Sequence, residues 1–224
     1  MPNDIIKGHK IGISSLQQRI KARQERVETT PPKVFSNRIL LLLDLSGSMT
    51  SHENGKAKIE HLKDALEGFA SSLDESNTSV CAESFPSGKV LLPTNSQLNL
   101  KTFAFSLESN GGTPLGAAMA HALSEYSITN GIVISDGQQT DGDRCFQEAM
   151  NYAEARIPLD CLHIGSSRDG EETLRRIAQA TNGKYIKFSD VGNFAKSLKY
   201  LQPAYRAMLE SGDAARLLGA KEVK

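Results

Sequence analysis

The sequence has no tryptophan, few aromatic residues (6%) and no net charge, because 26 lysines and arginines balance 26 aspartates and glutamates. A balanced charge gives the chain as a whole no electrostatic attraction to nucleic acid or to an anionic membrane surface. With 39% hydrophobic residues, a chain of 224 residues is long enough for one domain with a sizeable core. The composition therefore excludes disordered and fibrous proteins, and it predicts a globular protein that binds neither nucleic acid nor membranes.

Long hydrophobic runs are absent as well. The longest, Ile39–Leu43, is far shorter than the roughly 20 residues that span a bilayer. The N-terminus lacks the apolar stretch of about 7 to 15 residues that a secretory signal contains. The three cysteines, Cys81, Cys145 and Cys161, are odd in number and far apart, which is typical of reduced thiols rather than of disulfides. We therefore expect a cytoplasmic protein.

Short apolar runs alternate with segments whose apolar residues recur every three or four positions. This alternation of strands and helices predicts an α/β fold with a parallel sheet. Uninterrupted apolar runs predict strands that are covered on both faces, and they occur at 39–43 and 132–134. Residues 159–164, between Pro158 and Gly165, predict a third strand of this kind. Residues 184–188 alternate and are expected nearer an edge, whereas 79–85 and 89–92 flank a turn at Pro86 and predict a hairpin.

Apolar stripes at helical spacing predict helices that each lay one face on the sheet. The clearest stripes lie at 59–73, 115–126, 146–153 and 174–178. A further stripe at 194–208 is interrupted by Pro203, which predicts a kink or a break in that helix. Residues 98–107 fit either a strand or a helix, and we favour a short helix.

The pattern divides the chain into three parts. Residues 1–36 carry seven lysines and arginines against three acidic residues and form a basic N-terminal arm, which we expect to be helical. This arm either packs on its own domain or contacts a partner, and both readings stay open. Residues 37–210 form the folded domain, and residues 211–224 form a polar C-terminal tail that is expected to be frayed.

Polar side chains cluster where the predicted strands end. Asp44, Ser46 and Ser48 follow the first buried strand, Asp136 follows the second, and Thr113 precedes a helix between them. Ligands of parallel α/β sheets bind at these strand ends. Oxygen donors without histidine or cysteine suit Mg²⁺, Mn²⁺ or Ca²⁺ rather than zinc. Two aspartates at ~5 Å would repel each other by about 3 kcal/mol at an effective dielectric constant of ~20, and a divalent cation would reverse this cost.

With its D-x-S-x-S segment, its threonine and its D-G loop, the chain resembles a von Willebrand factor type A (VWA) domain with a metal-ion-dependent adhesion site. The resemblance implies a doubly wound, mostly parallel central sheet with one short antiparallel edge strand and helices on both faces. It implies that Ser46 and Ser48 bind the metal directly, Thr113 directly or through water, and Asp44 and Asp136 largely through water. One coordination position then stays open for an acidic side chain of a partner protein.

Four further residues near the motif are candidates for rim contacts that select the partner: Met49, Gln138, Gln139 and Asp141. Asp143 is expected to be the N-cap of the helix that starts near Arg144.

Other functions fit the sequence less well. A Mg²⁺-dependent phosphotransferase or hydrolase of the haloacid dehalogenase type needs a second aspartate two residues after the first, and Ser46 stands there. A scaffold with a vestigial metal site stays open. We therefore expect a binding module that is not an enzyme. The resemblance implies, as possible contexts, an accessory role to an AAA-type ATPase or a bacterial stress-response system.

Overall fold

A computed structural model of the chain describes residues 34–53, 55–136, 139–165, 167–188 and 221–222. The chain divides into two units, Met1–Val34 and Phe35–Lys224, and the second is described below. The predicted helical arm and the predicted helix at 194–208 lie outside the described residues.

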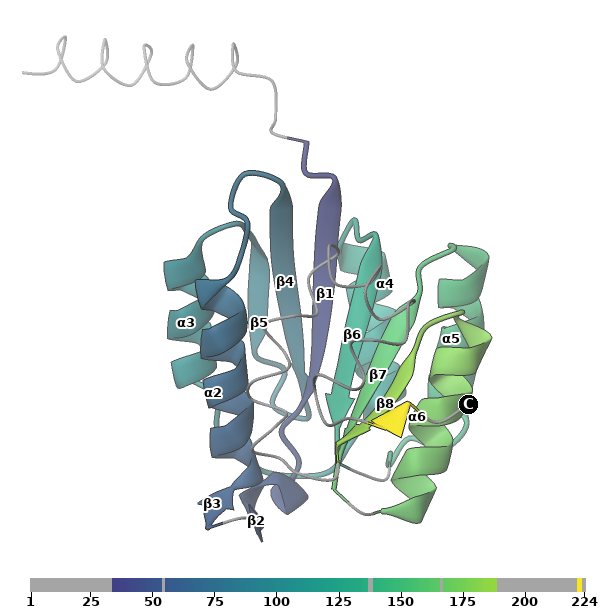
Figure 1. The fold of residues 1–224 in the computed structure, drawn as a ribbon. Helices are drawn as coiled ribbons and strands as arrows, with labels where there is room; N and C mark the ends of the chain where they lie inside the picture. Colours follow the sequence, from purple (N-terminus) through teal and green to yellow (C-terminus); the bar gives the residue numbers. More distant parts are fainter. Residues whose placement is uncertain (1–33, 54, 137–138, 166, 189–220, 223–224) are drawn as a thin grey trace, which may run out of the picture. The chain divides into compact units, whose positions relative to one another are not determined.

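A seven-stranded sheet forms the centre of the second unit, with the strand order β5-β4-β1-β6-β7-β8-β9 (Figure 1). The strands, in chain order, are β1 (Asn37–Asp44), β4 (Thr78–Phe85), β5 (Val90–Thr94), β6 (Asn130–Ser135), β7 (Leu159–Ile164), β8 (Tyr185–Phe188) and β9 (Lys221–Glu222). A separate small antiparallel pair consists of β2 (His52–Glu53) and β3 (Lys56–Ala57).

Strand β1 lies at the point where the winding of the sheet reverses. It pairs in parallel with β4 on one side and with β6 on the other, and β7 and β8 continue the parallel order beyond β6. The connection after β1 therefore leads to one side of the sheet, and the chain later returns to the other side. In doubly wound sheets, this switch point opens a crevice at the carboxyl ends of the strands. The predicted fold class is confirmed.

Helices cover both faces of the sheet, and in Figure 1 the sheet runs between α2 and α3 at the left and α5 and α6 at the right. Their bounds are α2 (Lys58–Ser71), α3 (Gln97–Phe105), α4 (Leu115–Glu125), α5 (Arg144–Glu154) and α6 (Arg168–Ala180), with a short 3₁₀ helix, η1 (Gly47–Thr50), after β1. Among the described residues, no helix is long and apolar enough to cross a membrane.

The uninterrupted apolar run of β1 is explained by two hydrophobic cores, one on each face of the sheet. Ile39, Leu41 and Leu43 join the core under α2 and α3, whereas Leu40 and Leu42 join the core under α4, α5 and α6. All five side chains are fully buried. Because successive side chains of a strand point to opposite faces, a strand between two helix layers needs apolar residues at every position.

The three cysteines are free, as the sequence predicts, and all three are buried. Burial raises the pKa of the Cys81 thiol to about 12 and that of Cys145 to about 11, and it raises the pKa of Cys161 well above its ordinary value. These thiols therefore stay protonated at neutral pH.

The structure confirms the predicted hairpin, because β4 and β5 pair antiparallel, and it confirms the short helix α3. The predicted antiparallel edge strand is β5, and the structure adds a second one that was not predicted. The two residues of β9, in the tail predicted to be frayed, pair antiparallel with β8 at the opposite edge. This pairing uses backbone hydrogen bonds, which leave no hydrophobic pattern in so short a polar segment.

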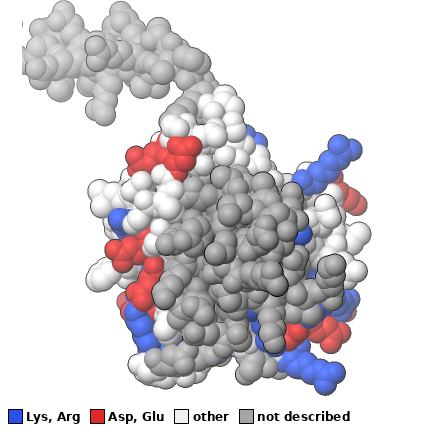
Figure 2. Space-filling view, in the orientation of Figure 1, with Lys and Arg blue, Asp and Glu red and all other residues white. Residues whose placement is uncertain are grey.

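On the face shown in Figure 2, described acidic and basic side chains both lie around the rim. This distribution agrees with the balanced charge of the sequence.

The loop after β6 supplies the N-terminal cap of α4. Asp141 Oδ2 accepts a hydrogen bond of 2.9 Å from the backbone N–H of Ala117, in the first turn of α4. Thr140 adds two bonds to Thr113, because its N–H donates to the Thr113 carbonyl at 2.8 Å and its hydroxyl accepts from the Thr113 N–H at 3.1 Å. Helix N-terminal N–H groups lack partners within the helix, so these contacts fix the start of α4.

We predict that Asp141→Ala lowers the free energy of unfolding by about 1 kcal/mol, because the capped N–H of α4 loses its acceptor. Asp143→Ala is the matched control. Asp143 holds the N-cap position of α5, as predicted, but its side chain makes no capping hydrogen bond, so the change should stay within about 0.5 kcal/mol. Urea unfolding measured with chelator present checks both variants, and equal destabilisation would contradict the capping role.

Candidate functional site

Asp44 ends β1 beside the end of β6, and its carboxylate is fully buried there. Its Oδ1 accepts a 2.8 Å hydrogen bond from the Ser46 N–H, and its Oδ2 accepts a 2.5 Å bond from the Ser135 hydroxyl. The register of the parallel pair sets this contact. Leu43 of β1 lies opposite Ile134 of β6, so the residues that follow them, Asp44 and Ser135, also lie side by side. The switch point of the sheet is therefore lined by a carboxylate that two neighbours hold in place.

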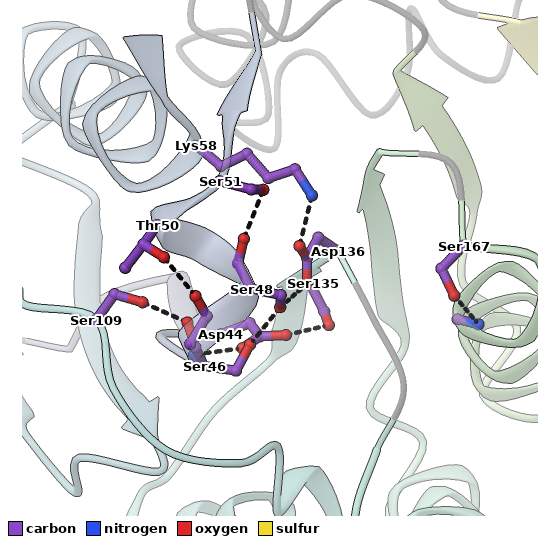
Figure 3. A network of polar contacts seen from close by, with 12 residues as sticks. Asp44, Ser46, Ser48, Thr50, Ser51, Lys58, Ser109, Ser135, Asp136 and Ser167 are labelled. Atoms are coloured by element: carbon purple, nitrogen blue, oxygen red, sulfur yellow. Dashed lines mark hydrogen bonds and ion pairs between the residues drawn. The ribbon is translucent and has the colours of Figure 1, made fainter.

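Hydroxyl groups link Asp44 and its loop to the second carboxylate (Figure 3). Ser46 Oγ lies 2.9 Å from Ser48 Oγ, and the Ser48 hydroxyl donates to Asp136 Oδ1 at 2.8 Å. Ser46 and Asp136 are buried, whereas Ser48 is exposed. Four of the five predicted ligands thus form one hydrogen-bonded cluster that reaches the surface at Ser48.

The other oxygen of Asp136 carries an ion pair. Lys58, the first residue of α2, places Nζ 2.6 Å from Asp136 Oδ2. The Lys58 side chain is 15% exposed and that of Asp136 only 2%, so water screens this pair weakly.

Thr113, the fifth predicted ligand, lies in a loop that is bonded to the Asp44 loop. The N–H of Gly47 donates to the Gly111 carbonyl at 2.9 Å, and the N–H of Asn110 donates to the Leu45 carbonyl at 2.7 Å. Ser109 adds a hydroxyl bond to the Leu45 carbonyl at 3.1 Å. Thr113 itself is 5% exposed. The structure therefore places the threonine loop against the motif, although Thr113 makes no side-chain hydrogen bond with the other four residues in the described part of the chain.

The electrostatics of the cluster favour a cation. Burial raises the pKa of the Asp44 carboxyl above its ordinary value, and the nearby charge of Asp136 adds to this rise. The hydrogen bonds from Ser135 and Ser46 lower the pKa and only partly compensate. A positive ion at this position would stabilise the ionised form of Asp44.

The donor set fits a hard cation. It consists of carboxylate and hydroxyl oxygens, which Mg²⁺, Mn²⁺ and Ca²⁺ prefer. No cluster of three or more His, Cys, Asp or Glu side chains that could hold a metal occurs in the described residues. An ion at this site would therefore depend on the hydroxyls of Ser46, Ser48 and Thr113 as well as on Asp44 and Asp136.

The predicted rim residues differ in how far they are exposed. Met49 is fully buried in the core under α2 and α3, so its assignment as a rim contact is wrong. The 3₁₀ turn η1 directs this apolar side chain inward, where burial is more favourable than exposure. Gln139 and Asp141 are half-buried, and Asp141 caps α4. Gln138 lies outside the described residues.

Sequence reasoning missed two residues of the cluster, Ser135 and Lys58. Ser135 directly precedes Asp136, and the expected pairing of two buried strands would have placed it beside Asp44. Lys58 carries no such signal, because 78 positions separate it from Asp136.

Comparison with known proteins places the fold in a family. The sequence matches the von Willebrand factor type A domain over residues 37–186. The uncharacterized protein YwmD of Bacillus subtilis is 25% identical over 190 residues, which cover 74% of this chain and 84% of YwmD.

Solved structures show the same fold. BatB of Bacteroides thetaiotaomicron superposes with a TM-score of 0.62 at 21% identity, over 81% of this chain and all of BatB. The domain of the pilus tip protein Mfa5 of Porphyromonas gingivalis gives 0.61 at 10% identity, over 80% of this chain and 97% of that domain. Manganese-loaded TRAP of Plasmodium vivax gives 0.56 at 19% identity, over 75% of this chain and 73% of TRAP. The sequence match over residues 37–186 establishes that the chain belongs to the von Willebrand factor type A domain family.

Proposed function

We propose that the chain is a protein-interaction module whose binding depends on a divalent cation held by Asp44, Ser46, Ser48, Thr113 and Asp136. The observation that carries this proposal is the hydrogen-bonded cluster at the switch point of the sheet, in which the Ser46 N–H and the Ser46 and Ser48 hydroxyls link the two aspartates and Ser48 reaches the surface. Members of the family commonly mediate protein interactions, and this supports the same role here.

The chemistry of the site suggests both the ion and the partner. Mg²⁺ is our first choice, with Mn²⁺ or Ca²⁺ as alternatives, and the manganese-loaded structure of TRAP supports a cation of this class. When bound, the ion would supply a positive charge to an incoming anionic group. The exposed Ser48 marks the side on which an acidic side chain of a partner would approach.

We further propose that the module is not an enzyme. The residue two positions after Asp44 is Ser46, whose hydroxyl bonds to Ser48 and is a poor proton shuttle near neutral pH. A phosphotransferase of the haloacid dehalogenase type is not favoured. The buried free thiols suit a reducing compartment such as the cytoplasm. An AAA-type ATPase or a bacterial stress-response system is our proposed context.

We predict that the wild-type protein binds one equivalent of Mn²⁺ and that Asp44→Asn weakens this binding at least tenfold. Asparagine keeps the shape of the side chain but removes a negative charge from the site. Asp143→Asn also removes one negative charge, but outside the cluster. It is the control and should bind Mn²⁺ as the wild type does. Isothermal titration calorimetry measures the affinities, and circular dichroism confirms that each variant is folded. Unchanged Mn²⁺ affinity in Asp44→Asn would overturn the metal assignment.

A second prediction concerns the partner. Affinity capture from a lysate of the source organism, with millimolar Mg²⁺ or with excess chelator, should retain a protein only in Mg²⁺ and only on the wild type. Asp44→Asn serves as the negative control and Asp143→Asn as the positive one. If the same proteins are retained in every lane, the interaction does not use the metal site.

A further inference from the structure

Lys58 contacts the candidate site directly. Its ammonium lies 2.6 Å from Asp136 Oδ2, while Oδ1 of the same carboxylate accepts the Ser48 hydroxyl at 2.8 Å. Figure 3 shows the lysine reaching from α2 towards Asp136, beside the serines of the cluster. One carboxylate therefore contacts both the proposed metal ligands and a fixed positive charge of the protein.

Two features hold Lys58 there. Its backbone N–H donates to the Ser51 carbonyl at 3.0 Å, and the Ser51 hydroxyl donates to the Ser48 carbonyl at 2.7 Å, so its backbone is tied to the loop of the site. The side chain runs past Gly165, which follows β7 with a φ of +108°. A Cβ at Gly165 would lie 3.2 Å from the Lys58 Nζ, so the missing side chain leaves the space that the ammonium uses.

A neighbouring ion pair shows that this arrangement is not an ordinary surface contact. Lys56 pairs with Asp64, but the two side chains are 40% and 50% exposed. The corresponding values for Lys58 and Asp136 are 15% and 2%. Charges that are withdrawn from water interact more strongly than exposed ones. The attraction between Lys58 and Asp136 is therefore stronger than that between Lys56 and Asp64.

We propose that Lys58 is an internal cation that competes with the divalent ion for Asp136 and so sets the cation concentration at which the site loads. This inference rests on the proposed function. Without metal, the ammonium compensates the charge of Asp136 and keeps the empty site folded. A divalent ion among the same oxygens meets a like charge only a few ångströms away, and its binding is weakened until the lysine side chain moves aside.

Replacing the lysine tests the competition. Lys58→Met keeps most of the length of the side chain but removes its charge, and we expect Mn²⁺ to bind this variant at least tenfold more tightly than the wild type in calorimetry at low ionic strength. Lys58→Arg retains the charge and should stay within about threefold of the wild type. Lys56→Met is the matched control, two residues away and outside the site, and should change the affinity less than twofold.

A second measurement covers the possibility that Lys58→Met folds poorly without metal. Its urea midpoint should be lower than that of the wild type in chelator and should recover in Mn²⁺, because the ion replaces the missing charge. Failure of Mn²⁺ to restore the midpoint would overturn the proposal.

The outcomes separate this inference from the proposed function. If the wild type binds Mn²⁺ and Lys58→Met binds it equally or more weakly, the competition is wrong and the metal site stands. If neither protein binds Mn²⁺, the proposed metal-dependent function is wrong, and so is the proposed competition between Lys58 and the ion.

Discussion

The parallel pairing of β1 with β6 is the constraint on which the site depends. It places the last residue of β1 beside the last residue of β6, so that Asp44 and Ser135 meet at the switch point and Asp136 follows at once. Packing in the two hydrophobic cores holds this register, because a shift of one residue would move each side chain of β1 from the core that it fits to the opposite one. The geometry of the polar cluster is therefore set by the apolar packing of the strands that carry it.

Much of this arrangement could be predicted from the sequence. Uninterrupted apolar runs identified the buried strands, and the rule that parallel strands end at one edge brought Asp44, Ser46, Ser48 and Asp136 together. What could not be predicted depends on side-chain direction or on long-range pairing. Met49 stands in a polar loop and could point either way, and the 3₁₀ turn after β1 decided that it points into the core. The Lys58 ion pair required the orientation of α2 relative to β6.

The loops of the site also support one another. Residues 140 and 141 bind Thr113 and the first turn of α4, and the loop before α4 is in turn bonded to Gly47 and Leu45. The segments that carry the five proposed ligands are thus connected by backbone hydrogen bonds. Such a connected frame keeps ligands near their binding geometry before an ion arrives, which reduces the entropy lost on binding.

The burial of all three cysteines has a practical consequence for studying the protein. Only the thiolate reacts quickly with maleimides and iodoacetamides, and burial keeps these thiols protonated and out of reach. A single cysteine introduced at an exposed position would therefore be labelled selectively, with the native cysteines left in place. A fluorophore attached beside Ser48 could then report ligand binding at the switch point directly in solution.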